Sequence, residues 1–171
     1  VNDPPDATFD NDAPGLTVIE DDPALLNGQQ SIPNFVETQT IGAATGETEQ
    51  SITSFAVARA SGTATSLFTD DGQPAINNAT GELTFTLKAN ANTGTAGVVG
   101  EGPTVFNVTV TDSGSNLSPN DNVTVKANAF SITVNSRNDA PVLTDRTTTL
   151  TLNEDDTTNL GRTISDLLDN S

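Results

Sequence analysis

The sequence predicts an all-β chain folded as an antiparallel β-sandwich, because strand-forming and turn-forming residues dominate it. Thr and Val, which favour strands, alternate with stretches rich in Asn, Gly and Asp, which favour turns. Of the 171 residues 33% are hydrophobic, and seven Phe are the only aromatic residues. Such a thin core fits two packed sheets better than a large globular enzyme.

Several short segments alternate polar and apolar residues between Gly-, Asn-, Asp- and Pro-rich breaks, as in sandwiches. The predicted strands are 16–20, 51–58, 82–88, 105–111, 122–134 and 147–152, with a short apolar patch at 32–36 that Pro33 interrupts. Because successive strand residues point to opposite faces, the alternation predicts these inward side chains: Ile52 with Phe55 or Val57, Leu83, Phe85, Leu87, Phe106, Val108, Val110, Phe130, Ile132 and Val134.

The chain is strongly acidic, with 23 acidic and 6 basic residues and a formal net charge of −17. Self-repulsion at this level destabilises a compact state unless the charge is screened. Nucleic acids and anionic membrane surfaces are therefore poor partners, and divalent cations are good ones. Solubility and adaptation to salty water are the alternative explanations of the charge.

Cys and His are both absent, which excludes disulfides, thiolate zinc sites and catalysis by Ser-His-Asp or Cys-His groups. Hard cations with oxygen ligands remain, above all calcium. A glycosidase carboxylate pair is conceivable, but no Trp or Tyr is present to stack on a sugar. No Gly-rich phosphate loop with a following Lys appears. No apolar stretch is long enough to span a membrane. We therefore expect a protein that is not an enzyme.

An internal repeat organises the chain. Residues 17–22 (TVIEDD) align with 151–156 (TLNEDD), and 2–4 (NDP) align with 138–140 (NDA). A long period of this kind is typical of an array of domains. We therefore predict one repeat at 1–136, followed at 137–171 by a linker and the incomplete start of the next repeat.

Two stretches resemble a known family. TVFNVTVTDSGSNLSPNDNVTVKANAFSITVNSRNDAPVL (104–143) is similar to the closing half of bacterial cadherin-like and immunoglobulin-like tandem repeats, and GELTFTLKANANTGTAGVV (81–99) is similar to their middle. The resemblance implies Greek-key β-sandwich modules in the rod of a large exported surface protein, with Ca²⁺ bound where successive modules meet.

The resemblance also implies calcium ligands. These are Glu20 with the adjoining Asp21 and Asp22, Asp70 or Asp71 in mid-domain, Asp112 near Asn2 and Asp3, the linker residues Asn138 and Asp139, and Glu154 for the next junction. Each has a plainer alternative. The two Glu-Asp-Asp runs are also typical of solvated strand ends, and the remaining motifs are typical of turns. The linker lacks an additional Asn that animal cadherins carry before Ala-Pro.

The expected function is that of a calcium-binding structural or adhesive repeat module, extracellular or at the cell surface. Its expected partners are neighbouring repeats or identical subunits, and cell-surface or matrix ligands; nucleic acid and membrane insertion are not expected. One alternative is a self-assembling filament or surface-layer subunit, in which the segment 147–152 adds a strand to a neighbour's open sheet edge. Another is an accessory module of a secreted polysaccharide enzyme, against which the missing Trp and Tyr count.

Overall fold

The computed structural model describes residues 2–10, 15–42, 50–62, 67–94, 102–115, 117 and 121–138. The chain divides into two compact units, Val1–Asn138 and Asp139–Ser171, and all described residues belong to the first. The predicted strand 147–152 lies outside them, and the repeat boundary after residue 136 stays a prediction. The prediction of an all-β chain is confirmed for the first unit.

Nine strands and two single 3₁₀ turns make up the described part of the chain. The strands are β1 (Asp6–Phe9), β2 (Leu16–Ile19), β3 (Gln29–Ile32), β4 (Val36–Thr40), β5 (Ile52–Ser61), β6 (Ala75–Ile76), β7 (Leu83–Thr86), β8 (Thr104–Asp112) and β9 (Val123–Asn135). The 3₁₀ turns are η1 (Leu26–Gly28) and η2 (Asp70–Gly72). Asn and Gly with positive φ occur at several turns between the strands, as their steric freedom allows.

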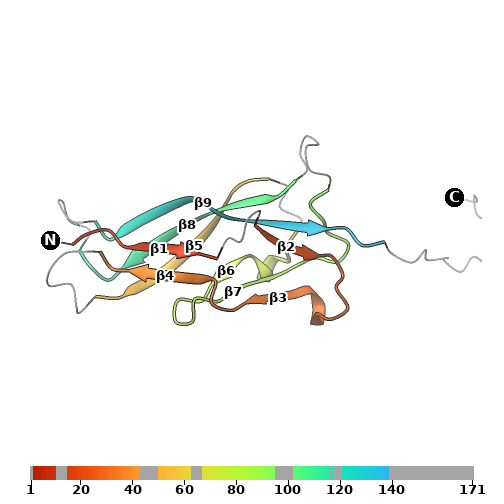
Figure 1. Ribbon diagram of the computed structural model, residues 1–171, viewed down its shortest axis with the longest axis horizontal. Coiled ribbons are helices and arrows are strands. Elements are labelled where there is room, and N and C mark those ends of the chain that lie inside the picture. The colour runs from red at the N-terminus through yellow and green to blue at the C-terminus, as the bar shows by residue number, and fades with distance from the viewer. Residues whose placement is uncertain are drawn as a thin grey trace, which may run out of the picture. The chain divides into compact units, whose positions relative to one another are not determined.

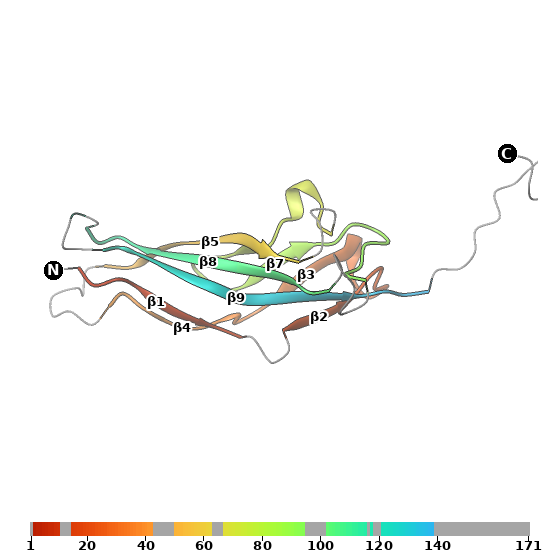
Figure 2. The ribbon, with the colours of Figure 1, turned by 90° about the horizontal axis from the view of Figure 1, so that it is seen from above.

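The strands form a four-stranded sheet in the order β2-β9-β8-β5, a three-stranded sheet in the order β3-β7-β6, and the pair β1-β4 (Figure 1, Figure 2). β2 runs parallel to β9, and the other paired strands are antiparallel. A hydrogen bond of 2.9 Å from Val36 N to Gly81 O ties the start of β4 to the chain before β7. The Greek-key connectivity stays a prediction.

The predicted apolar patch at 32–36 is the place where the chain changes from β3 to β4. Pro33 and Asn34 form the turn, and Asn34 adopts a positive φ of 56°. Pro lacks the N–H that a continuous strand would use, so the strand is interrupted here. The turn brings Phe35 into the core, where it is fully buried.

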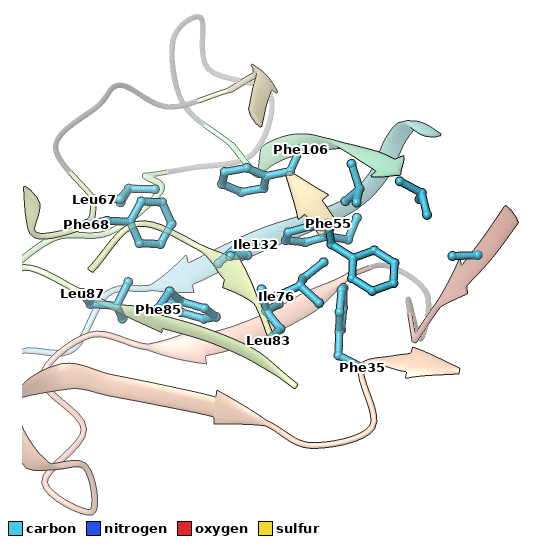
Figure 3. Packing of buried hydrophobic residues seen from close by; sticks show 14 of the residues in the cluster. Phe35, Phe55, Leu67, Phe68, Ile76, Leu83, Phe85, Leu87, Phe106 and Ile132 are labelled. Carbon is cyan, nitrogen blue, oxygen red and sulfur yellow. The ribbon is translucent and has the colours of Figure 1, made fainter. Parts of the chain in front are cut away.

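The core lies between the four-stranded sheet and the other strands (Figure 3). Phe130 on β9 is at its centre, with ring centroids 5.0 Å from both Phe35 and Phe106. The alternation predicted the inward faces of β7, β8 and β9, and the burial of these residues confirms it. Phe55 is the buried member of the Phe55 and Val57 pair. β1, β6 and the buried Leu67 and Phe68 were not predicted, and β3 and β4 meet the predicted patch only at its two ends.

The chain enters and leaves the first unit at opposite ends (Figure 1). At one end, called here the N-terminal pole, Asn2 lies beside the end of β8 and the start of β9, bonded to Asp121. At the other, the C-terminal pole, β9 ends next to β2, and Glu20 N donates to Asn135 O. The long antiparallel strands β8 and β9 connect the two poles.

Candidate cation site

The N-terminal pole is built by three chain segments that hydrogen-bond one another. Asn2 Nδ2 donates to Asp121 O over 2.5 Å, and Asp121 N contacts Asn2 O at 3.4 Å. Ser113 N, just after β8, donates to Ser51 O over 2.9 Å. The first residues of the chain are therefore fixed against the loop between β8 and β9.

Asp112 is the buried carboxylate of this pole. It is the last residue of β8 and occupies an inward position, so only 2% of its surface is exposed. Its Oδ1 accepts a hydrogen bond of 2.7 Å from Gly114 N, the turn expected of an Asp-x-Gly sequence. Its Oδ2 is buried and receives no hydrogen bond from any described residue.

Two amide oxygens at the same pole also lack a hydrogen-bond donor. Gln50 Oε1 and Asn122 Oδ1 are buried without a donor among the residues described. Asn122 adjoins Asp112, since Asp112 N donates to Asn122 O over 3.0 Å and Asn122 Nδ2 lies 3.4 Å from Asp112 O. Gly114 makes room for the Gln50 amide, because a Cβ at Gly114 would lie 2.6 Å from Gln50 Oε1 and would overlap Asn2 as well.

The N-terminal pole thus places a carboxylate oxygen and two amide oxygens in a buried, donor-poor region. Buried polar atoms in folded proteins are normally hydrogen-bonded, so three such acceptors on neighbouring residues of one pole are unusual. All three are hard oxygen ligands of the kind that calcium binds. The arrangement therefore suits a cation or water molecules, both of which bind to acceptor oxygens.

In the part of the chain that the structure describes, no group of three or more Asp or Glu side chains is placed to hold a metal ion. Asp112 is accompanied instead by the amides of Gln50 and Asn122. Asp3 follows Asn2 at this pole and makes an interaction of its own. Asp139 and Glu154, also predicted as ligands, lie outside the described residues.

Glu20 at the C-terminal pole has a different environment. It is 3% exposed, and both carboxylate oxygens accept hydrogen bonds from uncharged donors. Arg137 N donates to Oε1 over 2.8 Å, and Asn92 Nδ2 donates to Oε2 over 3.0 Å. Asn92 Oδ1 in turn accepts from Gly94 N over 3.0 Å, which fixes the orientation of the amide. Glu20 therefore holds the departing chain in place.

Asp21 and Asp22, which follow Glu20, both accept hydrogen bonds from backbone N–H groups. Asp21, with a positive φ of 48°, accepts from Asn90 N at 3.0 Å, and its carbonyl accepts from Arg137 Nη1 at 2.9 Å. Asp22 Oδ1 accepts from Ala24 N at 2.9 Å, an Asx turn. Asn138 lies in the same region and lines a shallow hollow with Asp22.

Asp70 and Asp71 lie apart from these groups, in η2. Asp70 lines a hollow with Arg59 and Gln73, between β5 and the chain before β6. Neither residue shares a described contact with Asp112 or Glu20. The structure therefore places Asp112 and Asn2 at the N-terminal pole. It places Asn138 with the Glu20 run at the C-terminal pole. Asp70 and Asp71 are separate from both groups.

Comparison with protein-family models, curated protein sequences and solved structures found no match to this chain. The resemblance to cadherin-like and immunoglobulin-like repeats stays a prediction from the sequence. Among the residues that the structure describes, no helix is long and apolar enough to cross a membrane.

Proposed function

We propose that this chain is a structural module of a large extracellular surface protein and binds calcium at its N-terminal pole, where a preceding module would join it. The observation that carries the proposal is the buried Asp112 carboxylate, with one oxygen lacking a donor beside the donor-free amide oxygens of Gln50 and Asn122.

Electrostatics favours a cation at this position. A buried, unpaired carboxylate is unstable by several kcal/mol unless a positive charge or hydrogen-bond donors compensate it. The formal net charge of −17 adds a negative background, which a bound cation reduces. A cation coordinated by Asp112 Oδ2, Gln50 Oε1 and Asn122 Oδ1 would compensate the buried negative charge and would give all three acceptor oxygens a partner.

The ligand chemistry selects calcium among the common cations. Zinc and copper prefer imidazole and thiolate, and the chain has neither His nor Cys. Magnesium keeps most of its water and needs strict octahedral geometry, whereas calcium accepts six to eight oxygens, including neutral amide oxygens. With a single carboxylate the site is expected to be weak, in the range of about 10⁻⁴–10⁻³ M that is typical of extracellular modules.

The position of the site explains what binding would achieve. A preceding repeat of similar sequence would present its C-terminal pole here, with carboxylates corresponding to Asp21, Asp22 and Asp139. A cation between the two poles would convert repulsion between acidic groups into attraction and would limit hinge motion of the linker. Glu20 contributes from the opposite pole, because it fixes the direction in which the chain leaves.

Calorimetric titration of calcium into the chain tests the proposal. Wild type is expected to bind calcium in preference to magnesium, and Asp112→Asn is expected to abolish this binding while keeping the side-chain volume. Asp71→Asn is the matched control, since Asp71 is exposed in η2, apart from Asp112 and Glu20, and it is expected to bind as wild type does. Binding that is absent in wild type, or unchanged in Asp112→Asn, would reject the proposal.

A further inference from the structure

The outer face of the four-stranded sheet carries no charged residue. Its centre consists of cross-strand rows from β5, β8 and β9, which the register defines: Ser54, Thr111 and Val123 form one row, and Ala56, Thr109 and Val125 form the next. These six residues are called here the neutral face. On β8 the residues that alternate with them, Val108, Val110 and Asp112, are buried.

Charge in this sheet is distributed in the reverse of the usual way. Antiparallel sheets with one solvated face normally place apolar residues inward and polar or charged residues outward. The four strands of this sheet contain three charged residues, Arg59, Asp112 and Lys126. Arg59 pairs with buried Phe106, Lys126 pairs with buried Val108, and Asp112 is itself buried, so all three take inward positions.

The same outer face collects exposed apolar side chains. Val123 is 37% exposed and Val125 60%, and Ile19 on β2, also on the outward register, is 49% exposed. These are the exposed large hydrophobic residues found in the described strands. A surface of Val, Ala, Thr and Ser without charges is suited to packing against another sheet, because such side chains interdigitate at about 10 Å separation.

The charge of the whole chain indicates which partner fits. Two copies with a formal net charge of −17 each repel one another, so contact between them requires a surface that adds no further negative charge. The neutral face meets this requirement. The six residues themselves cover only about 190 Å², but the whole uncharged outer face is larger: the four strands contain 36 residues, which at about 3.3 Å by 4.8 Å each gives about 570 Å² per copy. Two copies would bury about 1,100 Å², just above the minimum for a specific interface.

We propose that two copies of this chain pair laterally, with the outer face of the four-stranded sheet of one packed against the same face of the other and the neutral faces at the centre of the contact. The contact is independent of the cation site and adds side-by-side association to the end-to-end arrangement proposed above. Because its area is small, the pair is weak and forms at high local concentration, as between neighbouring rods on a surface.

Sedimentation velocity of the full chain in EDTA, from about 10 µM to about 1 mM, tests the pairing in the concentration range expected of a small interface. The weight-average mass is expected to rise toward that of a dimer as concentration increases. Association is expected to be stronger in about 0.5 M NaCl than in about 0.05 M, because salt screens the repulsion between chains. EDTA keeps this result separate from calcium binding.

Two variants with the same net charge localise the contact. Val125→Lys puts a cation on the neutral face, and Gln29→Lys puts one on an exposed position of β3, in the other sheet. Both lower the net repulsion equally, so a loss of association in Val125→Lys alone supports the proposal. A chain that stays monomeric throughout, or association that both variants change equally, overturns it. Far-UV circular dichroism checks that each variant is folded.

Discussion

Glu20→Gln gives a sharp test of the C-terminal pole. The buried carboxylate accepts from Arg137 N and from Asn92 Nδ2. A Gln side chain offers one acceptor oxygen and presents an NH₂ group to the other donor. Asn92 cannot rotate its amide to compensate, because its Oδ1 already accepts from Gly94 N. One of the two bonds to position 20 must therefore be lost.

The expected cost follows from this count. Hydrogen bonds to charged groups contribute about 1.5–3 kcal/mol each, and a donor left unsatisfied adds to the loss. We expect Glu20→Gln to lower the free energy of unfolding by about 2 kcal/mol. Exposed Glu37 on β4 provides the matched control, since Glu37→Gln makes the same change of charge and is expected to cost less than about 0.5 kcal/mol.

Urea unfolding followed by far-UV circular dichroism measures both variants, since the chain has no Trp or Tyr for fluorescence. The measurement is made in calcium and again in EDTA. Because uncharged protein donors occupy the Glu20 carboxylate, the loss is expected to be equal in both solutions. A loss that appears only with calcium would make Glu20 a metal ligand and would refute this reasoning.

Three further perturbations have distinct expected outcomes. Phe130→Ala removes a ring stacked on Phe106 at the centre of the core and is expected to cost about 3–5 kcal/mol in urea unfolding; a cost below about 1 kcal/mol would contradict this packing. The hydrogen bond from Lys126 lowers the pKa of Asp6 below its usual 3.8, so the pair stabilises the fold above that pH and its contribution is lost as the pH falls through the lowered value. The contribution is at most about 0.5 kcal/mol because both side chains are partly exposed to solvent. Wild type is expected to be more stable than Asp6→Asn only at a pH above the lowered pKa. A stability difference that grows as the pH falls in acid unfolding would contradict this. Gly114→Ala pushes a Cβ into the amides of the N-terminal pole and is expected to remove the calcium response of the thermal midpoint, whereas an unchanged response would place the cation elsewhere.

The inward faces of the long strands were predictable because alternation repeats over several residues. In β8, for example, Phe106, Val108 and Val110 occur at every second position. The one buried residue of β1 is the small Ala7, and β6 has only two residues, so neither strand carries a run of alternating large apolar residues. Phe35 and Phe68 are buried from a turn and an isolated bridge, and no local pattern signals such positions.

The candidate site was predictable only in part. The resemblance to tandem repeats predicted Asp112 as a ligand, and the structure buries this residue at the N-terminal pole. Gln50 and Asn122 were not predicted as its companions, because isolated amides carry no motif in a chain so rich in Asn. The two partners of Glu20, Asn92 and Arg137, come from distant segments that only the fold brings together.

Thermal unfolding in calcium and in EDTA, for wild type and Asp112→Asn, tests the central proposal most directly. At calcium 100-fold above the dissociation constant, binding to the folded state adds about 2.7 kcal/mol, which raises the midpoint by about 8 °C for a unit of this size. Wild type is expected to show this rise. Asp112→Asn is expected to show none, and in EDTA to be at least as stable as wild type, because its NH₂ group supplies donors to buried acceptors. Equal midpoints of wild type in calcium and in EDTA would contradict the account.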